Sequence, residues 1–209
     1  MSQRSQLLQD FLTSMYAAIV EQPNINSEAV LTAERIFGAL ETPMGATRLP
    51  PSKLPICELL PTVARELSRK IQPGADSASA PSKAVAHAQA LAALSARLRW
   101  YRRQGADRIG EPFISGHANA TVIGEGGLEE HDGIWIGVSL MAPGITYPEH
   151  RHPPEEVYVV LSPGEWQQSG GAWHKPGVGG IVYNPPDILH AMRSGSAPLL
   201  ASWCLWSAT

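Results

Sequence analysis

The spacing of apolar residues changes near residue 105, and this change constrains the fold more than any other feature of the chain. Before it, apolar residues recur at intervals of three and four, which is typical of amphipathic helices. After it, residues 117–209 carry short apolar, β-branched or aromatic runs separated by Gly and Pro. Several short strands at this spacing are typical of a β-sandwich or barrel. The sequence therefore predicts an α+β protein, with a helical region at 1–108 and a β region at 109–209.

Four segments carry the helical periodicity: 7–22, 27–41, 54–71 and 83–103. The third contains Pro61, so we expect it to be kinked or to form two short helices. The fourth is rich in Ala and has a stripe of Leu residues, which favours a regular helix. The segment 73–82 between them has the Gly, Ser and Pro composition of a loop.

Composition excludes several classes of protein. The chain has 16 Lys and Arg against 19 Asp and Glu, so it lacks the basic excess that general nucleic-acid binding requires. Its two cysteines, Cys57 and Cys204, exclude a disulfide framework. No window approaches the roughly 18 apolar residues of a membrane span. The N-terminal residues also lack the apolar stretch of a secretory signal, so we expect a soluble cytoplasmic protein.

Two histidines and a glutamate lie close together in the stretch PEHRHPPEEVYVV. His150 and His152 are two residues apart, so on an extended strand both imidazoles point to one face and can approach one ion. Glu156 lies beyond two prolines that prevent regular strand pairing and bend the chain. His190 comes later, after the turn sequence NPPD. Imidazoles with one carboxylate suit Fe(II), Mn(II), Ni(II) or Zn(II), and the sequence does not choose among these ions.

Both stretches resemble the paired motifs of the cupin superfamily. The matching residues are Gly144, His150, His152, Glu156 and Gly164 in the first motif, and Gly179, Pro185 and His190 in the second. Gly164 comes one residue later than usual, and Asp187 and Ser194 replace the usual Gly and Asn, but no departure falls on a ligand position. The resemblance implies a jelly-roll-like cupin β-barrel that binds one divalent transition metal ion per chain through His150, His152, Glu156 and His190.

A narrower resemblance links the chain to the cupin-type dimethylsulfoniopropionate lyases of marine bacteria. It rests on Tyr147 and Tyr158, the four motif ligands and the helical N-terminal half. It implies a carbon–sulfur lyase that cleaves this small zwitterion to dimethyl sulfide and acrylate. In this family the tyrosine two residues after the glutamate, here Tyr158, is associated with proton abstraction or with metal binding. Tyr147 is a second family-like tyrosine near the site.

Several of these residues also have a purely structural interpretation. An inward-facing tyrosine on a barrel strand, such as Tyr158, is most often part of the core. His87 lies in the Ala-rich helix, where we expect a surface or inter-helix residue, and His117 lies near a turn, where we expect it to be solvated. The tryptophans are mainly candidates for core or surface cover, although one or two of them can face a cationic sulfonium group.

Three other functions remain open from the sequence. A cupin with three histidines and one glutamate can also act as an Fe(II)-dependent dioxygenase, which would consume oxygen. It can also be a non-catalytic small-molecule-binding module or sensor, although the N-terminal half shows no basic helix-turn-helix. A sugar isomerase is a weaker alternative, because it needs more polar residues to bind hydroxyl groups. The N-terminal helices are expected to pack on the barrel, wall the pocket or form a homodimer contact.

Overall fold

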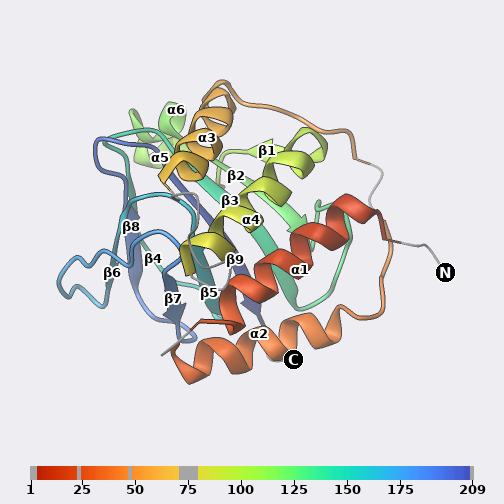
Figure 1. Ribbon diagram of the computed structural model, residues 1–209. Coiled ribbons are helices and arrows are strands. Elements are labelled where there is room, and N and C mark those ends of the chain that lie inside the picture. Colours follow the sequence, from red (N-terminus) through yellow and green to blue (C-terminus); the bar gives the residue numbers. More distant parts are fainter. Residues whose placement is uncertain (1–3, 23–24, 47–48, 71–79, 208–209) are drawn as a thin grey trace.

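The computed structural model describes residues 4–22, 25–46, 49–70 and 80–207. Its helices come first and its strands follow, as predicted (Figure 1). The larger helical elements are α1 (Gln6–Val20), α2 (Ser27–Ala39), the 3₁₀ helix η1 (Pro55–Leu59), α3 (Leu60–Lys70), α4 (Ala80–Leu94) and the 3₁₀ turn η2 (Ser95–Arg97). Two four-residue helices, α5 (Ala106–Ile109) and α6 (Phe113–Gly116), precede the main run of strands.

Local sequence explains where these helices begin. Ser5 accepts a hydrogen bond from the backbone N–H of Leu8 at the start of α1, and Asn26 accepts one from Glu28 at the start of α2. The predicted third segment forms two short helices, η1 and α3, which confirms one of the two alternatives for it. Most of the predicted loop at 73–82 lies outside the described residues, and α4 begins at Ala80.

The fourth predicted helix extends too far in the C-terminal direction. Instead of continuing to residue 103, α4 ends at Leu94, and Trp100 and Tyr101 form the short strand β1. Trp100 pairs with Ala120 and Tyr101 with Asn119 in the neighbouring strand. Pairing with a strand distant in sequence therefore overrides the local helical periodicity, and it brings the residues after β1 to the edge of the barrel.

The remaining strands form two antiparallel sheets. They are β2 (His117–Ile123), β3 (Ile134–Met141), β4 (Thr146–His150), β5 (Glu155–Val160), β6 (Glu165–Gln168), β7 (Ile181–Asn184), β8 (His190–Arg193) and β9 (Leu199–Trp206). The larger sheet has the order β1-β2-β3-β9-β5-β7, and the smaller has the order β4-β8-β6. This arrangement confirms the predicted cupin-type barrel behind an N-terminal helical region.

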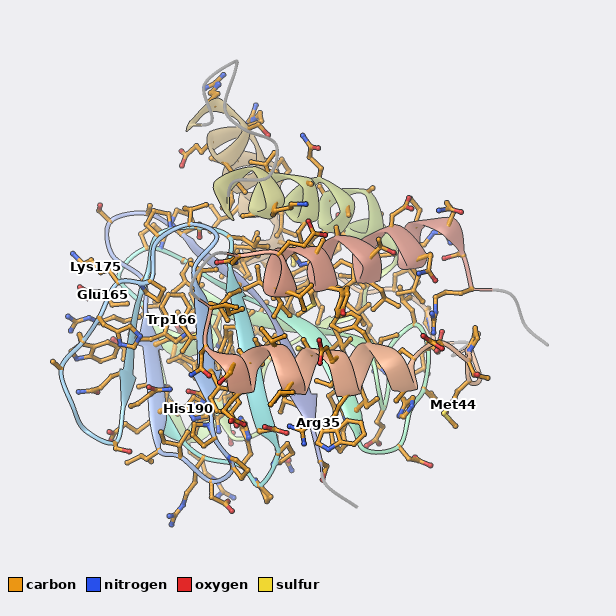
Figure 2. The ribbon with its side chains drawn as sticks, turned by 60° about the horizontal axis from the view of Figure 1, so that its bottom comes forward. Arg35, Met44, Glu165, Trp166, Lys175 and His190 are labelled. Carbon is orange, nitrogen blue, oxygen red and sulfur yellow. The ribbon has the colours of Figure 1, made fainter. Side chains whose placement is uncertain are left out.

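Alternation along each strand separates an apolar core from a cavity. On β3, Ile134, Ile136, Val138 and Leu140 belong to the core cluster that also contains buried residues of α1, α2 and α4. Trp135 and Ser139 point to the opposite face and line a cavity inside the barrel. The helices thus cover one face of the larger sheet, as both Figure 1 and Figure 2 show.

The helices and strands share this core, so the N-terminal region packs on the barrel, which is one of its expected roles. The division of the chain at residues 108 and 109 stays a prediction. Among the described helices, none combines the length and apolar character needed to cross a membrane.

Candidate metal centre and active site

Three histidines converge at one end of the barrel. His150 ends β4, His190 begins β8, and the two residues are directly paired in the smaller sheet. His152 lies in the turn that follows β4. One ring nitrogen from each of His150, His152 and His190 can be chosen so that all three lie within 4.8 Å of one another. The structure therefore brings together the three histidines that the sequence predicts as ligands.

Backbone carbonyls orient all three imidazoles. The Nδ1 atoms of His150, His152 and His190 lie 3.0, 2.9 and 2.9 Å from the carbonyl oxygens of Pro148, Pro154 and Ile188. Because a carbonyl oxygen only accepts, each Nδ1 carries the proton and donates. A ring with its proton on Nδ1 can present the lone pair of Nε2 to a metal ion.

Glu156 supplies a carboxylate to the same point. Its Oε2 lies 3.4 Å from Nε2 of His152 and 3.4 Å from Nε2 of His190. The Asn184 side-chain amide donates to Oε2 over 3.0 Å, which orients the buried carboxylate. Burial alone would raise the pKa of Glu156, but the neighbouring His152 and His190 imidazoles lower it well below its ordinary range. Glu156 is therefore anionic at neutral pH.

The site fits a divalent cation. Within the described part of the chain, the buried Nε2 of His190 has no hydrogen-bond partner, although Glu156 lies nearby. A buried lone pair without a partner is costly, and a metal ion would satisfy it. Burial lowers the pKa of His150 to about 4, so this ring is neutral and able to bind a metal at neutral pH. Three imidazoles and one carboxylate form a donor set for a first-row transition ion.

Two buried tyrosines lie beside these four residues. Tyr158 follows Glu156 on the same face of β5, and burial together with the negative charge of Glu156 raises its pKa well above the usual 10. Burial also raises the pKa of Tyr147, on β4. The Tyr147 ring centroid lies 4.9 Å from that of His150, and its hydroxyl oxygen lies 3.4 Å from the donating amide of Asn119.

A cavity of about 330 Å³ opens onto this centre. Its walls include five predicted site residues, His150, His152, Glu156, Tyr147 and Tyr158. They also carry polar and aromatic groups from β2, β3 and β9. These include Asn119, Thr121, Ser139, Trp135 and Trp203, while Tyr101 and Arg103 complete the wall near β1.

The polar wall was not predicted from the sequence. Asn119 and Thr121 are two residues apart on β2, so they share a face, and this alternation was the available signal. Ser139 donates to Asn119 over 2.9 Å and accepts from the indole N–H of Trp203 over 3.0 Å. These contacts fix the Asn119 amide so that its nitrogen donates to Tyr147.

Two other histidines are buried, and one of them, His117, differs from expectation. His87 is fully buried between helix and sheet, where its ring nitrogens contact Ser14 and Ser202 at 3.0 and 2.8 Å. Its contact with Ser14 of α1 makes it an inter-helix residue, which is one of its two expected positions, and burial lowers its pKa to about 3. His117 is also buried rather than solvated, with its ring stacked on Phe113 at a centroid distance of 3.8 Å. Contacts distant in sequence bury both rings.

The fold and the site together define a cupin-type barrel with a three-histidine, one-carboxylate centre and an N-terminal helical region. Residues 28–201 match the dimethylsulfoniopropionate lyase family, and the chain belongs to this family. A 113-residue stretch is 33% identical to the dimethylsulfoniopropionate lyase DddQ of Ruegeria pomeroyi and covers 54% of this chain and 56% of that protein. The chain spans about half the length of the curated relatives it matches, at 56% and 48%.

Solved structures show the same fold over nearly the whole chain. The crystal structure of DddQ from Ruegeria pomeroyi superposes with a TM-score of 0.70 and 24% identity, covering 98% of this chain and 93% of that chain. A structure from the work on the lyases RdDddP and RnDddQII superposes with a TM-score of 0.68 and 20% identity, covering 97% and 93%. The similarity therefore includes the N-terminal helices as well as the barrel.

Proposed function

We propose that this chain is a metal-dependent carbon–sulfur lyase that cleaves dimethylsulfoniopropionate to dimethyl sulfide and acrylate. The observation that carries the proposal is the convergence of His150, His152, His190 and Glu156 beside Tyr158, in a chain of the dimethylsulfoniopropionate lyase family. The neighbouring cavity of about 330 Å³ has room for a small zwitterion.

The three histidines and Glu156 would hold one divalent transition ion per chain. Fe(II), Zn(II), Mn(II) and Ni(II) all suit this donor set. When bound, the ion supplies positive charge that stabilises a nearby phenolate and the negative charge that develops on the substrate carboxylate.

Tyr158 is the proposed base. Without a metal ion, burial and the charge of Glu156 raise the pKa of the Tyr158 hydroxyl. This hydroxyl must therefore lose its proton before it can act as a base. The phenolate oxygen then takes a proton from the carbon next to the substrate carboxylate. The electron pair of that C–H bond forms the C=C bond of acrylate, and the C–S bond breaks with its electrons on sulfur. Dimethyl sulfide leaves as a neutral molecule, so its departure needs no acid.

The other cavity residues would bind and orient the substrate. Tyr147 lies on β4 in the smaller sheet and is the alternative base. Trp135 and Trp203 present aromatic rings to the cavity, and such rings attract a sulfonium cation. Their apolar surface also excludes water from the reacting carbon.

Product analysis separates this proposal from its rivals. Purified protein of measured metal content is incubated with dimethylsulfoniopropionate while dissolved oxygen is recorded. The proposal predicts dimethyl sulfide and acrylate in equal amounts and no oxygen consumption. Oxygen uptake would indicate the dioxygenase, and binding without products would indicate the non-catalytic module.

A further inference from the structure

Arg103 is an unassigned cation in the wall of the cavity. Among the described residues that line the cavity, it carries the only guanidinium or ammonium group. Within the described ranges, no carboxylate forms an ion pair with it. The one carboxylate of the lining, Glu156, is instead close to His152 and His190. The guanidinium is therefore available to an anionic ligand.

The surrounding structure fixes Arg103 in this place. Its backbone N–H donates to Nε2 of the buried His117 over 3.1 Å, and Nδ1 of His117 donates to the carbonyl oxygen of Phe113. The guanidinium carbon lies 5.0 Å from the centroid of the Tyr147 ring, which is a cation–π distance. Tyr147 in turn contacts His150. Arg103 is thus held one aromatic ring away from the candidate metal centre.

The aromatic part of the wall lies farther along the same sheet. His117, whose ring binds the backbone of Arg103, pairs with Met141, whereas Gly137 pairs with both Thr121 and Trp203. The indole N–H of Trp203 donates to Ser139, which donates to Asn119, and Asn119 donates to the hydroxyl of Tyr147, the ring that Arg103 contacts. The cavity wall thus carries both a guanidinium and an indole ring, which matches a ligand with a carboxylate at one end and a sulfonium at the other.

We propose that Arg103 binds the substrate carboxylate and so sets the orientation of the zwitterion, with its sulfonium toward Trp203. This inference rests on the proposed function. A planar guanidinium can form two parallel hydrogen bonds with a carboxylate, which a lysine cannot reproduce. In this orientation the carbon next to the carboxylate faces the tyrosines, and the sulfonium lies against the aromatic wall.

Calorimetric titration with acrylate tests the carboxylate site without turnover. The proteins are the wild type, Arg103→Met, Arg103→Lys and Arg102→Met, all with the same measured metal content. Arg102 is a matched control because it is the adjacent arginine, is exposed and donates to the Ile114 carbonyl. We expect Arg103→Met to raise the Kd of acrylate about 10- to 100-fold, from the usual strength of a charged hydrogen bond. Arg103→Lys should fall between the wild type and Arg103→Met, and Arg102→Met should match the wild type.

A second titration uses trimethylsulfonium, which has the cation but no carboxylate. Its affinity should not fall in Arg103→Met, because the substitution removes only a like charge. Equal Kd values for acrylate in the wild type and Arg103→Met would overturn the inference. An equal loss of affinity for acrylate and trimethylsulfonium in Arg103→Met would also overturn it. So would an equal effect of Arg102→Met and Arg103→Met on the Kd of acrylate. If the wild type releases no dimethyl sulfide, the proposed function fails, while the acrylate titration still decides the role of Arg103.

Discussion

Glu155 and Glu156 are neighbours in β5, yet their carboxylates bind groups on opposite faces of the larger sheet. Glu155 accepts hydrogen bonds from Thr32 and Tyr183, each over 2.8 Å, and pairs with Arg35 of α2 at 2.7 Å, on the helical side (Figure 2). Glu156 lies 3.4 Å from His152 and His190 on the cavity side. One residue therefore attaches a helix to the barrel, while the next contributes to the candidate metal centre.

This division predicts opposite effects for two matched substitutions. Glu155→Gln should lower the free energy of unfolding by about 1–3 kcal/mol, because it weakens several buried hydrogen bonds, while metal content is retained. Glu156→Gln should lose most of the metal, because it removes the anionic ligand, with a smaller effect on unfolding of the metal-free protein. Denaturant unfolding and elemental analysis of both variants check these outcomes. Full metal content in Glu156→Gln would contradict the assignment.

The base assignment predicts a selective loss of turnover. Tyr158→Phe removes one hydroxyl and should lower kcat by about 10²–10⁴-fold, the usual value of general-base catalysis, with a smaller change in KM. The variant should keep its fold and metal. Loss of metal would instead identify Tyr158 as a ligand, and near-normal turnover would move the base to Tyr147. If Tyr147→Phe and Tyr158→Phe both keep wild-type turnover, the tyrosine-base mechanism is wrong.

The buried His87 predicts acid sensitivity. Its folded-state pKa of about 3 lies below the ordinary 6.5, so between these values the unfolded chain binds a proton that the folded chain does not. Stability is therefore present above pH 6.5 and is lost as the pH falls through this window, by at most about 5 kcal/mol. His87→Gln should flatten this part of the stability profile, and the exposed His174→Gln should not. Parallel profiles for the wild type and His87→Gln would contradict the assignment.

The close packing of Trp203 against Gly137 predicts that a larger residue at position 137 weakens substrate binding. A Cβ atom at this position would lie 2.3 Å from the Trp203 ring and 2.5 Å from the carbonyl oxygen of Ala120. Gly137→Ala should therefore displace Trp203, destabilise the protein by about 1–3 kcal/mol and raise KM. Gly38→Ala is the control, because a Cβ there has no neighbour within 4 Å among the described residues. Unchanged KM in Gly137→Ala would show that Trp203 does not help to bind the substrate.

The candidate ligands could be predicted because their geometry is largely local. Two strand positions separate His150 from His152, so the pleat alone gives them a common face. Glu156 follows after one bend, and the motif resemblance supplied the more distant His190. The pairing of β4 with β8 in the smaller sheet then brings His150 and His190 into register. The roles of these residues and of the two tyrosines stay predictions until they are measured.

The rest of the cavity depends on contacts between distant parts of the chain. Arg103 reaches the cavity because α4 ends early and β1 pairs with β2, whereas the sequence predicted a helix as far as residue 103. Asn119, Ser139 and Trp203 come from three strands, and only the register of the sheet makes them neighbours. Local periodicity does not contain this information. The expected homodimer contact and cytoplasmic location also stay predictions.

Release of dimethyl sulfide during metal titration decides whether this chain is a metal-dependent lyase. Metal-depleted protein receives increasing amounts of one divalent ion with dimethylsulfoniopropionate in excess, and headspace gas chromatography measures the dimethyl sulfide. We expect a release rate that rises with bound metal, saturates at about one ion per chain and is lost when His152 and His190 are both replaced by Ala. A rate independent of bound metal, or wild-type release by the double variant, would contradict this expectation.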